Sequence, residues 1–470
     1  MTDSDIDTAP RTLRSLARHD ESSITILGAG PAGALMATLL AQRGHRVLVF
    51  ERLPDLRRSP NVAHRSINLA LADRGIHALK RAGAFDGIAR LLVPMRGRML
   101  HELRGETFIP YGREPHEVIY SISRAQLTAA LLDRAEQTGQ VELRFRQPCI
   151  SVDGGQRQLC IQDIPTGKLT MRSMQRTIGA DGAGSVLRRW LVERCGVPCR
   201  EDVLAHGYKE LTIAPDSAGR HRLDPHALHI WPRGEFMLIA LPNVDGSFTA
   251  TLFLPQEGSV GFAALTDATH LQAFFQVQFP DALRLLPDLE RQFFDHPTGS
   301  LGTVYLDRWS ANDSLILIGD AAHAVVPFHG QGMNCAFEDC VELDALLGAG
   351  LEWPAALREF ERRRKPNADA IAAMALANYV EMRDTVRDPK FKLQKELSLE
   401  LERRFPERFI PQYSMVMFHH EIPYAVARER GTRQQAILAE LTHRTDVLAE
   451  TDFALAERLI AEQLDPIEYK

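Results

Sequence analysis

The stretch ITILGAGPAGALMATLLAQRGHRVLVFE, residues 24–51, decides the fold of this chain. It begins with a short apolar run and continues through the glycine turn GAGPAG into a helix-like segment and a second apolar run. Short apolar runs next to glycines are typical of buried strands, and the longer run between them is typical of a helix. The order strand, glycine turn, helix, strand predicts the nucleotide-binding unit of an α/β fold.

The glycines of this turn have the spacing that suits a dinucleotide. Gly28 permits the tight turn, Gly30 lets the backbone approach a pyrophosphate, and Gly33 lets the helix pack on the strand. The helix N-terminus offers N–H groups to the anion, and Glu51, at the end of the second strand, can accept the hydroxyl protons of an adenosine ribose. A glycine turn alone also fits a flexible loop, but the flanking strands and the acid favour a dinucleotide site.

Length, charge and cysteine content exclude several classes of protein. The 470 residues allow two or three domains, and the 45% hydrophobic and 25% charged fractions exclude collagen-like and wholly disordered chains. The net charge of −6 predicts no nucleic-acid partner. Six cysteines predict reduced thiols and not a disulfide framework. Cys195 and Cys199 could form half of a metal site, but no second pair completes it, so no metal is predicted.

The sequence predicts no membrane segment. Residues 1–23 contain several acidic residues and no apolar core, which indicates a polar, disordered tail and not a signal peptide. No stretch approaches the roughly 18 consecutive apolar residues of a membrane helix. We therefore expect a cytoplasmic protein without a membrane anchor.

Two further turns combine glycine with aspartate. Asp181–Gly182 lies in TIGADGAGSVLR (177–188), and Gly319–Asp320 lies in SLILIGDAAHAVVPFHGQGMN (314–334). An aspartate at the end of a strand can bind a polyol such as the ribityl chain of a flavin. Each turn alone is more often an ordinary strand-to-helix turn, but together and in this order they point to a flavin.

The sequence pattern is strand-like between these two turns and helix-like after them. Around residues 200–260 the runs LHIWP, FMLIALPN and SFTATLFLP predict an antiparallel sheet. From Pro366 onward the chain is helix-like, and the run Arg362–Lys365 is expected to form the exposed end of a helix.

These motifs resemble the FAD-dependent aromatic hydroxylases, the single-component flavoprotein monooxygenases. The resemblance covers residues 24–365, and the sequence lacks a second GxGxxG with a following acid, which favours this group over the two-Rossmann disulfide reductases. Longer blocks are similar to the kynurenine 3-monooxygenases within the group, among them PMRGRMLHEL (94–103), LHIWPRGEFMLIALPN (228–243) and VPFHGQGMNCAFEDC (326–340).

The resemblance implies an α/β fold with three parts. These are a Rossmann-like FAD-binding domain of the para-hydroxybenzoate hydroxylase type, an antiparallel β-sheet substrate domain and a helical C-terminal region. We expect a discontinuous FAD-binding domain built from residues 24–90, 112–195 and 300–365, a substrate domain built from 91–111 and 196–299, and a helical region over 366–470.

The resemblance also implies site residues. The FAD contacts carried over by motif fall on the glycine turn, the end of the second strand and later segments: Gly28, Gly30, Ala32, Gly33, Phe50, Glu51, Arg52, Leu53, Ala70, Arg124, Cys149, Asp320, Met333 and Asn334. The substrate contacts fall on Arg98, Tyr111, Asn378 and Tyr413, with Arg98 and Tyr111 at a carboxylate. Without the resemblance, Arg98 would be interpreted as a surface arginine on an edge strand.

The reaction that the resemblance implies uses non-covalently bound FAD, NADPH and O2. NADPH reduces FAD, O2 adds at flavin C4a to form a hydroperoxide, and its distal hydroxyl is transferred to L-kynurenine, giving the 3-hydroxykynurenine of tryptophan degradation. The aniline nitrogen of the substrate already enriches the reacting carbon, so we nominate no acid or base. His323 and His329 are expected to be packing groups.

Alternatives remain open at this point. The chain could be a flavin hydroxylase of another aromatic carboxylic acid, a flavoprotein reductase without oxygen insertion, or a dinucleotide-binding protein without catalysis. Two features depart from the animal members of the family. His329 stands where they have phenylalanine, and the tail ERLIAEQLDPIEYK stands where they have a hydrophobic membrane anchor.

Overall fold

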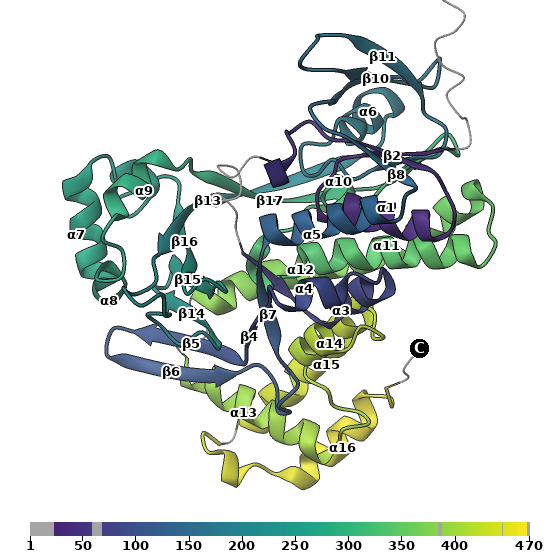
Figure 1. Ribbon diagram of the computed structural model, residues 1–470. Helices are drawn as coiled ribbons and strands as arrows, with labels where there is room; N and C mark the ends of the chain where they lie inside the picture. The colour runs from purple at the N-terminus through teal and green to yellow at the C-terminus, as the bar shows by residue number, and fades with distance from the viewer. Residues whose placement is uncertain (1–22, 59–67, 384–387, 444, 468–470) are drawn as a thin grey trace, which may run out of the picture.

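A computed structural model describes residues 23–58, 68–383, 388–443 and 445–467 (Figure 1). The predicted polar tail at 1–23 lies outside these residues except for Ser23. Across the part of the chain that is described, no helix has both the length and the apolarity needed to cross a membrane.

The stretch at 24–51 forms the centre of a six-stranded sheet. β1 (Ile24–Leu27) pairs in parallel with β2 (Val47–Phe50) and with β12 (Thr177–Gly179), and all three strands are buried. The strand order is β18-β19-β12-β1-β2-β8, in which only the edge strand β18 pairs antiparallel. The remaining bounds are Val141–Arg144 for β8, Ser310–Ala311 for β18 and Leu315–Leu317 for β19. The Rossmann-like α/β prediction is confirmed.

Helices cover the faces of this sheet (Figure 1). α1 (Pro31–Gln42) follows the glycine turn and packs against α5 (Arg124–Gln137) and α11 (Gly332–Gly348), and α11 packs against α12 (Trp353–Arg383). Because α1 lies between the sheet and these helices, it is apolar almost all round and buried from Gly33 to Ala41. Shorter helices complete this part: α3 (Asp73–Arg81), α4 (Phe85–Ala89), α6 (Val186–Cys195) and α10 (Asp320–His323).

The second sheet has seven strands, in the order β17-β13-β16-β15-β14-β5-β6. Its strands are β5 (Gly97–Glu102), β6 (Gly105–Pro110), β13 (Cys199–Ile213), β14 (Ala227–Pro232), β15 (Met237–Pro242), β16 (Phe248–Pro255) and β17 (Gly299–Leu306). The sheet is antiparallel except that β14 pairs in parallel with β5. Aromatic and aliphatic residues of β13–β16 share a core with three helices: α7 (Ala268–Gln278), α8 (Pro280–Leu283) and α9 (Leu289–Asp295).

The chain crosses between the two sheets several times. β17, which the expected division assigns to the third FAD-binding segment, pairs with β13 in the second sheet. β4 (Val93–Met95), expected in the substrate domain, instead joins β3 (Asn68–Leu71) and β7 (Ile119–Ser123) in a separate three-stranded sheet. The last small sheet holds β9 (Cys149–Asp153), β10 (Gln158–Gln162) and β11 (Leu169–Ser173).

The C-terminal region is helical. α12 continues through Pro366, so the run Arg362–Lys365 lies inside a helix and the prediction that it forms an exposed helix end is wrong. Arg364 is only 4% exposed and pairs with Glu338 and Asp339 of α11, because the two helices pack at this point. The later helices are α13 (Pro389–Arg404), α14 (Gln412–Phe418), α15 (Tyr424–Thr442) and α16 (Phe453–Gln463).

Arg74 on α3 joins this helical region to the FAD-binding part. Its side chain is fully buried and pairs with Glu338 at 2.6 Å. It also donates hydrogen bonds to the main-chain carbonyls of Val416, His419, His420 and Ile422 around the connection between α14 and α15. The C-terminal helices are therefore docked by a buried charge on the body of the molecule.

Candidate active site

The glycine turn has a closed side and an open side. Gly28 has φ +99°, and a Cβ there would lie 2.3 Å from the carbonyl oxygen of Ala180. A Cβ on Gly33 would lie 2.0 Å from the carbonyl oxygen of Gly28, so both positions require glycine. At Gly30 no described atom comes within 4 Å of the same point. The open side at Gly30 faces the start of α1, where main-chain N–H groups are available to a pyrophosphate.

Glu51 is held at the end of β2 beside this turn. Its carboxylate accepts the N–H of Ala29 and the N–H of Leu53, each at 2.8 Å. Each oxygen accepts only one of these bonds, so each keeps a lone pair for a ribose hydroxyl. Phe50 is buried under the strand end, whereas Arg52 and Leu53 are exposed.

Cys149 and Ala32 both pack against the hydrophobic core around the six-stranded sheet. Cys149 begins β9, and burial, with a contribution from Asp181, raises the pKa of its thiol to about 12. Ala32, in the first turn of α1, accepts a contact from Cys340 Sγ through its carbonyl. The thiol of Cys149 is thus neutral.

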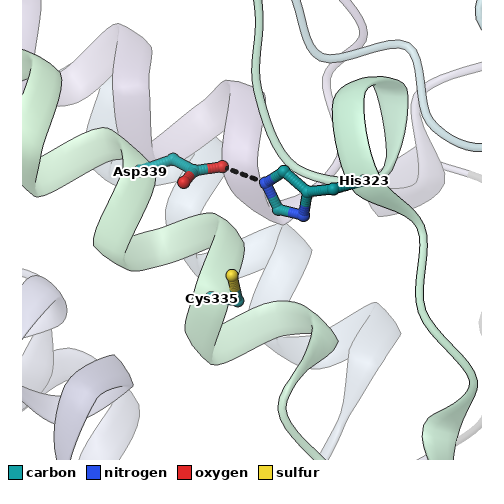
Figure 2. Close-up of side chains that lie close together, drawn as sticks. All are labelled: His323, Cys335 and Asp339. Atoms are coloured by element: carbon teal, nitrogen blue, oxygen red, sulfur yellow. Dashed lines mark hydrogen bonds and ion pairs between the residues drawn. The ribbon is translucent and has the colours of Figure 1, made fainter. Parts of the chain in front are cut away.

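The turn at Gly319–Asp320 is fixed by a buried carboxylate of α11. Asp339 accepts the Gly319 N–H at 2.9 Å and lies 2.6 Å from His323 Nε2 (Figure 2). Arg364 Nε donates to its other oxygen at 2.8 Å. These contacts hold the backbone at Gly319 in a positive φ conformation and leave Asp320 exposed at the head of α10. His323 is a structural partner of Asp339, as expected for a packing histidine.

Figure 2 also shows that Cys335 lies one turn before Asp339 on the same helix, on the side of His323. The three side chains have ligand atoms close enough to hold a metal ion. However, the Arg364 guanidinium contacts both Asp339 and the Cys335 sulfur. The buried positive charge of Arg364 would repel a metal ion bound here. We therefore assign a structural role to this cluster.

The start of α11 lies beside β3. Asn334 Nδ2 donates to the carbonyls of Ala70 and Gly330 at 2.8 and 2.9 Å, and its Oδ1 accepts the Ala72 N–H at 3.0 Å. The predicted flavin contacts Ala70, Met333 and Asn334 are therefore brought together. Because the Asn334 side chain is used by these bonds, it is the main-chain N–H groups of this helix start that remain for a ligand.

Arg124, the first residue of α5, is exposed. Burial raises the pKa values of Tyr208 and Glu210 on β13, and the positive charge of Arg124 offsets part of this rise. The positive charge of Arg124 therefore acts on residues of the second sheet, and one of them, Tyr208, lines a cavity.

A cavity of about 420 Å³ lies between the segment from Asp320 to Gly330 and the second sheet. Five predicted site residues line it: Ala70, Arg98, Tyr111, Asp320 and Tyr413. Apolar residues of the second sheet and of the loop before α11 form much of the remaining wall, including Leu228, Ile239, Phe253, Val326 and Phe328. The cavity thus has a polar end at Asp320 and an apolar middle.

The opposite end of the cavity is closed by Arg98 and two tyrosines. Arg98 is 8% exposed, and its Nη1 donates to Glu381 Oε1 at 3.0 Å. The guanidinium lies 5.0 Å from the ring centre of Tyr413, which stacks on Tyr111 at 5.6 Å. Burial opposes the charge, but Tyr413 and Glu381 outweigh it and hold the pKa of Arg98 above its ordinary value. Arg98 Nε is buried and finds no hydrogen-bond acceptor among the described residues.

Asn378 is expected to contact the substrate and His329 to be a packing group. Asn378 does not line the cavity; its Nδ2 donates to the carbonyl of Phe328 at 2.6 Å. His329 does line the cavity, and its ring stacks on Tyr413 at 5.5 Å. Burial lowers the pKa of His329 to about 4, so this histidine is neutral.

Glu381 is a residue of the site that the sequence reasoning missed. It lies three residues after Asn378 on α12, and residues at this spacing share one helix face. Once Asn378 is placed at the site, helical periodicity alone would have indicated Glu381. Its partner Arg98 lies almost 300 residues earlier, which no local pattern predicts.

The residues present fit an FAD molecule. The closed and open sides of the glycine turn suit a pyrophosphate, and Glu51 is held with lone pairs available. Asp320 is exposed at a rigid turn that borders the large cavity.

Comparisons with known proteins agree with this geometry. The family described as "FAD binding domain" matches residues 21–230 and 286–375. A kynurenine 3-monooxygenase of Myxococcus xanthus is 46% identical over 453 residues, covering 96% of this chain and 97% of that protein. One of Stenotrophomonas maltophilia is 47% identical over 454 residues, with 96% and 99% covered. The tetrameric form of 2-methyl-3-hydroxypyridine-5-carboxylic acid oxygenase has a similar fold, with a TM-score of 0.59 at 21% identity, covering 81% of this chain and 97% of that one. By this similarity along nearly its whole length, the chain belongs to the kynurenine 3-monooxygenase family of FAD-binding monooxygenases.

Proposed function

We propose that the protein hydroxylates L-kynurenine to 3-hydroxykynurenine with FAD, NADPH and O2. The observation that carries the proposal is the large cavity, which is lined by the predicted flavin-site residues Ala70 and Asp320 and also by the buried Arg98. An aromatic ring with a carboxylate at the end of its side chain fits this division into an apolar middle and a cationic end. The names and high identity of the relatives support the same substrate.

Arg98 and Tyr111 would bind the substrate carboxylate. The guanidinium is always charged, is buried, and has an Nε without an acceptor among the described residues. A carboxylate at this point would satisfy that donor and add charge-assisted hydrogen bonds. Asn378 would act through the Phe328 carbonyl that it holds, because this bond fixes the loop that forms the cavity wall.

The apolar wall would orient the ring and exclude water. Leu228, Ile239 and Phe253 come from adjacent strands of the second sheet, and Phe328 packs on Phe253 at 5.0 Å. A rigid, dry wall of this kind keeps the ring at a fixed position and protects a reactive oxygen species from water. His329 is neutral and therefore adds no charge to the wall.

Bound FAD would supply the redox chemistry by accepting electrons from NADPH and activating O2. The start of α11 would stabilise negative charge on the flavin, because unpaired N–H groups at a helix N-terminus favour an anion. The ring carbon ortho to the aniline nitrogen is electron-rich, so the chain needs no strong base beside it.

The experiment is a substrate panel on the purified protein. FAD absorbance is recorded first, and NADPH oxidation and product are then measured with L-kynurenine, kynurenate, anthranilate and 4-hydroxybenzoate. We expect 3-hydroxykynurenine from L-kynurenine and little stimulation by the other acids. Hydroxylation of a different acid would favour another aromatic hydroxylase, and NADPH oxidation without any hydroxylated product would favour a reductase.

We also propose that the protein works in the cytoplasm, which its six free thiols support. Fractionation of the source cells tests this, and recovery of the activity in the membrane fraction would contradict it.

A further inference from the structure

A second, smaller cavity of about 140 Å³ lies behind the Arg98 end of the large one. Arg98, Tyr111 and Tyr413 line both cavities, so these three side chains form the wall between them. The small cavity is lined by residues of hairpin β5–β6 and of the C-terminal helices α13 and α15. Figure 1 shows α13 below this hairpin. Its polar lining includes Glu381, Gln394, Lys395 and Gln434.

Charges of both signs meet at this wall. Arg98 and Lys395 each lie near the Tyr413 ring, at 5.0 and 5.2 Å from its centre. Glu381 is the one carboxylate among the described residues that pairs with Arg98. Its side chain is 34% exposed, so it is still accessible from the small cavity. The wall thus presents a cation and an anion side by side, 3.0 Å apart.

We propose that Glu381 accepts the α-ammonium group of the substrate while Arg98 binds the carboxylate on the same carbon. This inference rests on the proposed function and names the residue that makes the site selective for an amino acid. An ammonium and a carboxylate on one carbon lie as close together as Arg98 and Glu381 do. A zwitterion whose charged end enters this wall from the large cavity can therefore replace the internal ion pair with two new ones, so that neither Arg98 nor Glu381 is left unpaired.

The carboxylates that line the large cavity itself, Glu201 and Asp320, are not placed for this role. Glu201 lies 3.3 Å from Arg188, and Arg188 also donates to the carbonyls of Asp320 and Ala321. Glu201 and Asp320 therefore belong to the flavin end, whereas Arg98 is at the other end. Lys395 is on the small-cavity side and adds a second positive charge that favours a carboxylate at this wall.

The test compares L-kynurenine with its desamino analogue, 4-(2-aminophenyl)-4-oxobutanoate. The analogue keeps the aniline ring, the ketone and the carboxylate and lacks only the α-ammonium. We expect the wild-type protein to prefer L-kynurenine by at least about 10-fold in kcat/KM, as the loss of a charge-assisted contact predicts. Dissociation constants from the change in flavin absorbance provide a second measurement that does not depend on turnover.

Glu381→Gln should lower kcat/KM for L-kynurenine by about 10- to 100-fold. The value for the analogue should change by less than about threefold, because the amide leaves the carboxylate contact with Arg98 in place. Glu381→Asp keeps the charge and should recover part of the preference. Glu396→Gln, an exposed carboxylate next to Lys395 on α13, is the matched control and should behave like wild type.

Equal losses for both compounds in Glu381→Gln would overturn the inference, because Glu381 would then only position Arg98. A wild-type protein without preference between the two compounds would overturn it as well, even if the variant failed to fold. A wild-type protein that hydroxylates neither compound would instead contradict the proposed function, on which the inference rests.

Discussion

Replacing Asp339 with asparagine should destabilise the protein and weaken its hold on FAD. The carboxylate is fully buried and contacts Gly319 N–H, His323 Nε2 and Arg364 Nε at 2.9, 2.6 and 2.8 Å. The Asp339→Asn amide has similar shape but no charge, so Glu338 would be the one ionic partner left to Arg364 among the described residues. Breaking a buried ion pair costs about 3–5 kcal/mol, and we expect about 3 kcal/mol because Glu338 remains.

Urea unfolding, followed by fluorescence and by release of FAD, measures this effect. The FAD content after purification should also fall, because the single amide oxygen cannot replace both carboxylate oxygens, which accept from Gly319 N–H and Arg364 Nε and fix the turn that presents Asp320. Glu359→Gln on α12 is the control, since Glu359 pairs only with the exposed Arg362 and Arg363 among the described residues and should leave stability unchanged. A loss below about 1 kcal/mol for Asp339→Asn would refute the reasoning, because that is the size of a surface pair.

The same variant has a predictable pH dependence. Burial raises the pKa of Asp339, but His323 and Arg364 outweigh it, so its pKa in the folded protein lies below the ordinary 3.8. A lowered pKa gives stability that is fully present above the ordinary value and is lost as the pH falls through the lower, folded value. The difference in unfolding free energy between wild type and Asp339→Asn should therefore be constant near neutral pH and shrink in strong acid.

Three further changes test the substrate end, the cofactor end and a buried carboxyl on α13. Arg98→Ala should weaken L-kynurenine binding by roughly 2–4 kcal/mol in a flavin absorbance titration and leave FAD bound; unchanged affinity would place the carboxylate elsewhere. Glu51→Ala should lower the FAD content after dialysis, and full retention of the yellow cofactor would argue against the ribose role. Burial, with Glu117 adding to it, raises the pKa of Glu402 to about 7, so the folded protein holds a proton that the unfolded chain releases above about 4.5. The wild-type protein should lose stability as the pH rises from about 4.5 to about 7. Glu402→Gln should therefore be more stable than wild type by up to about 3 kcal/mol at pH 8 but not at pH 4.5. Equal effects at both pH values would show that the proton is not involved.

The fold and the cofactor half of the site could be predicted because their signals are local. Gly28 and Gly33 are required by backbone atoms of neighbouring strands and turns, and Glu51 follows directly after a buried strand. The turn at Gly319–Asp320 has the same character. Such features depend on a few adjacent residues, so sequence patterns carry them.

The substrate half could not be read from local patterns. Arg98, Tyr111 and Tyr413 come from a strand, the segment after a hairpin and a C-terminal helix, and only the family resemblance named them together. Arg364 shows how a local interpretation fails. A run of four basic residues looks like an exposed face, but the acids that pair with Arg364 lie on another helix more than 20 residues away.

The flavin end and the wall at Arg98 should respond differently to substitutions. The flavin end is built from turns of the central sheet and is rigid for the same reasons that the core is stable. The wall at Arg98 is complete only when α12 supplies Glu381 and α14 supplies Tyr413, and Arg74 docks α14 through main-chain carbonyls. Substitutions in the C-terminal helices should therefore disturb recognition of the substrate's charged end before they disturb the cofactor, so that loss of substrate affinity with retained FAD is the expected signature of damage to this region.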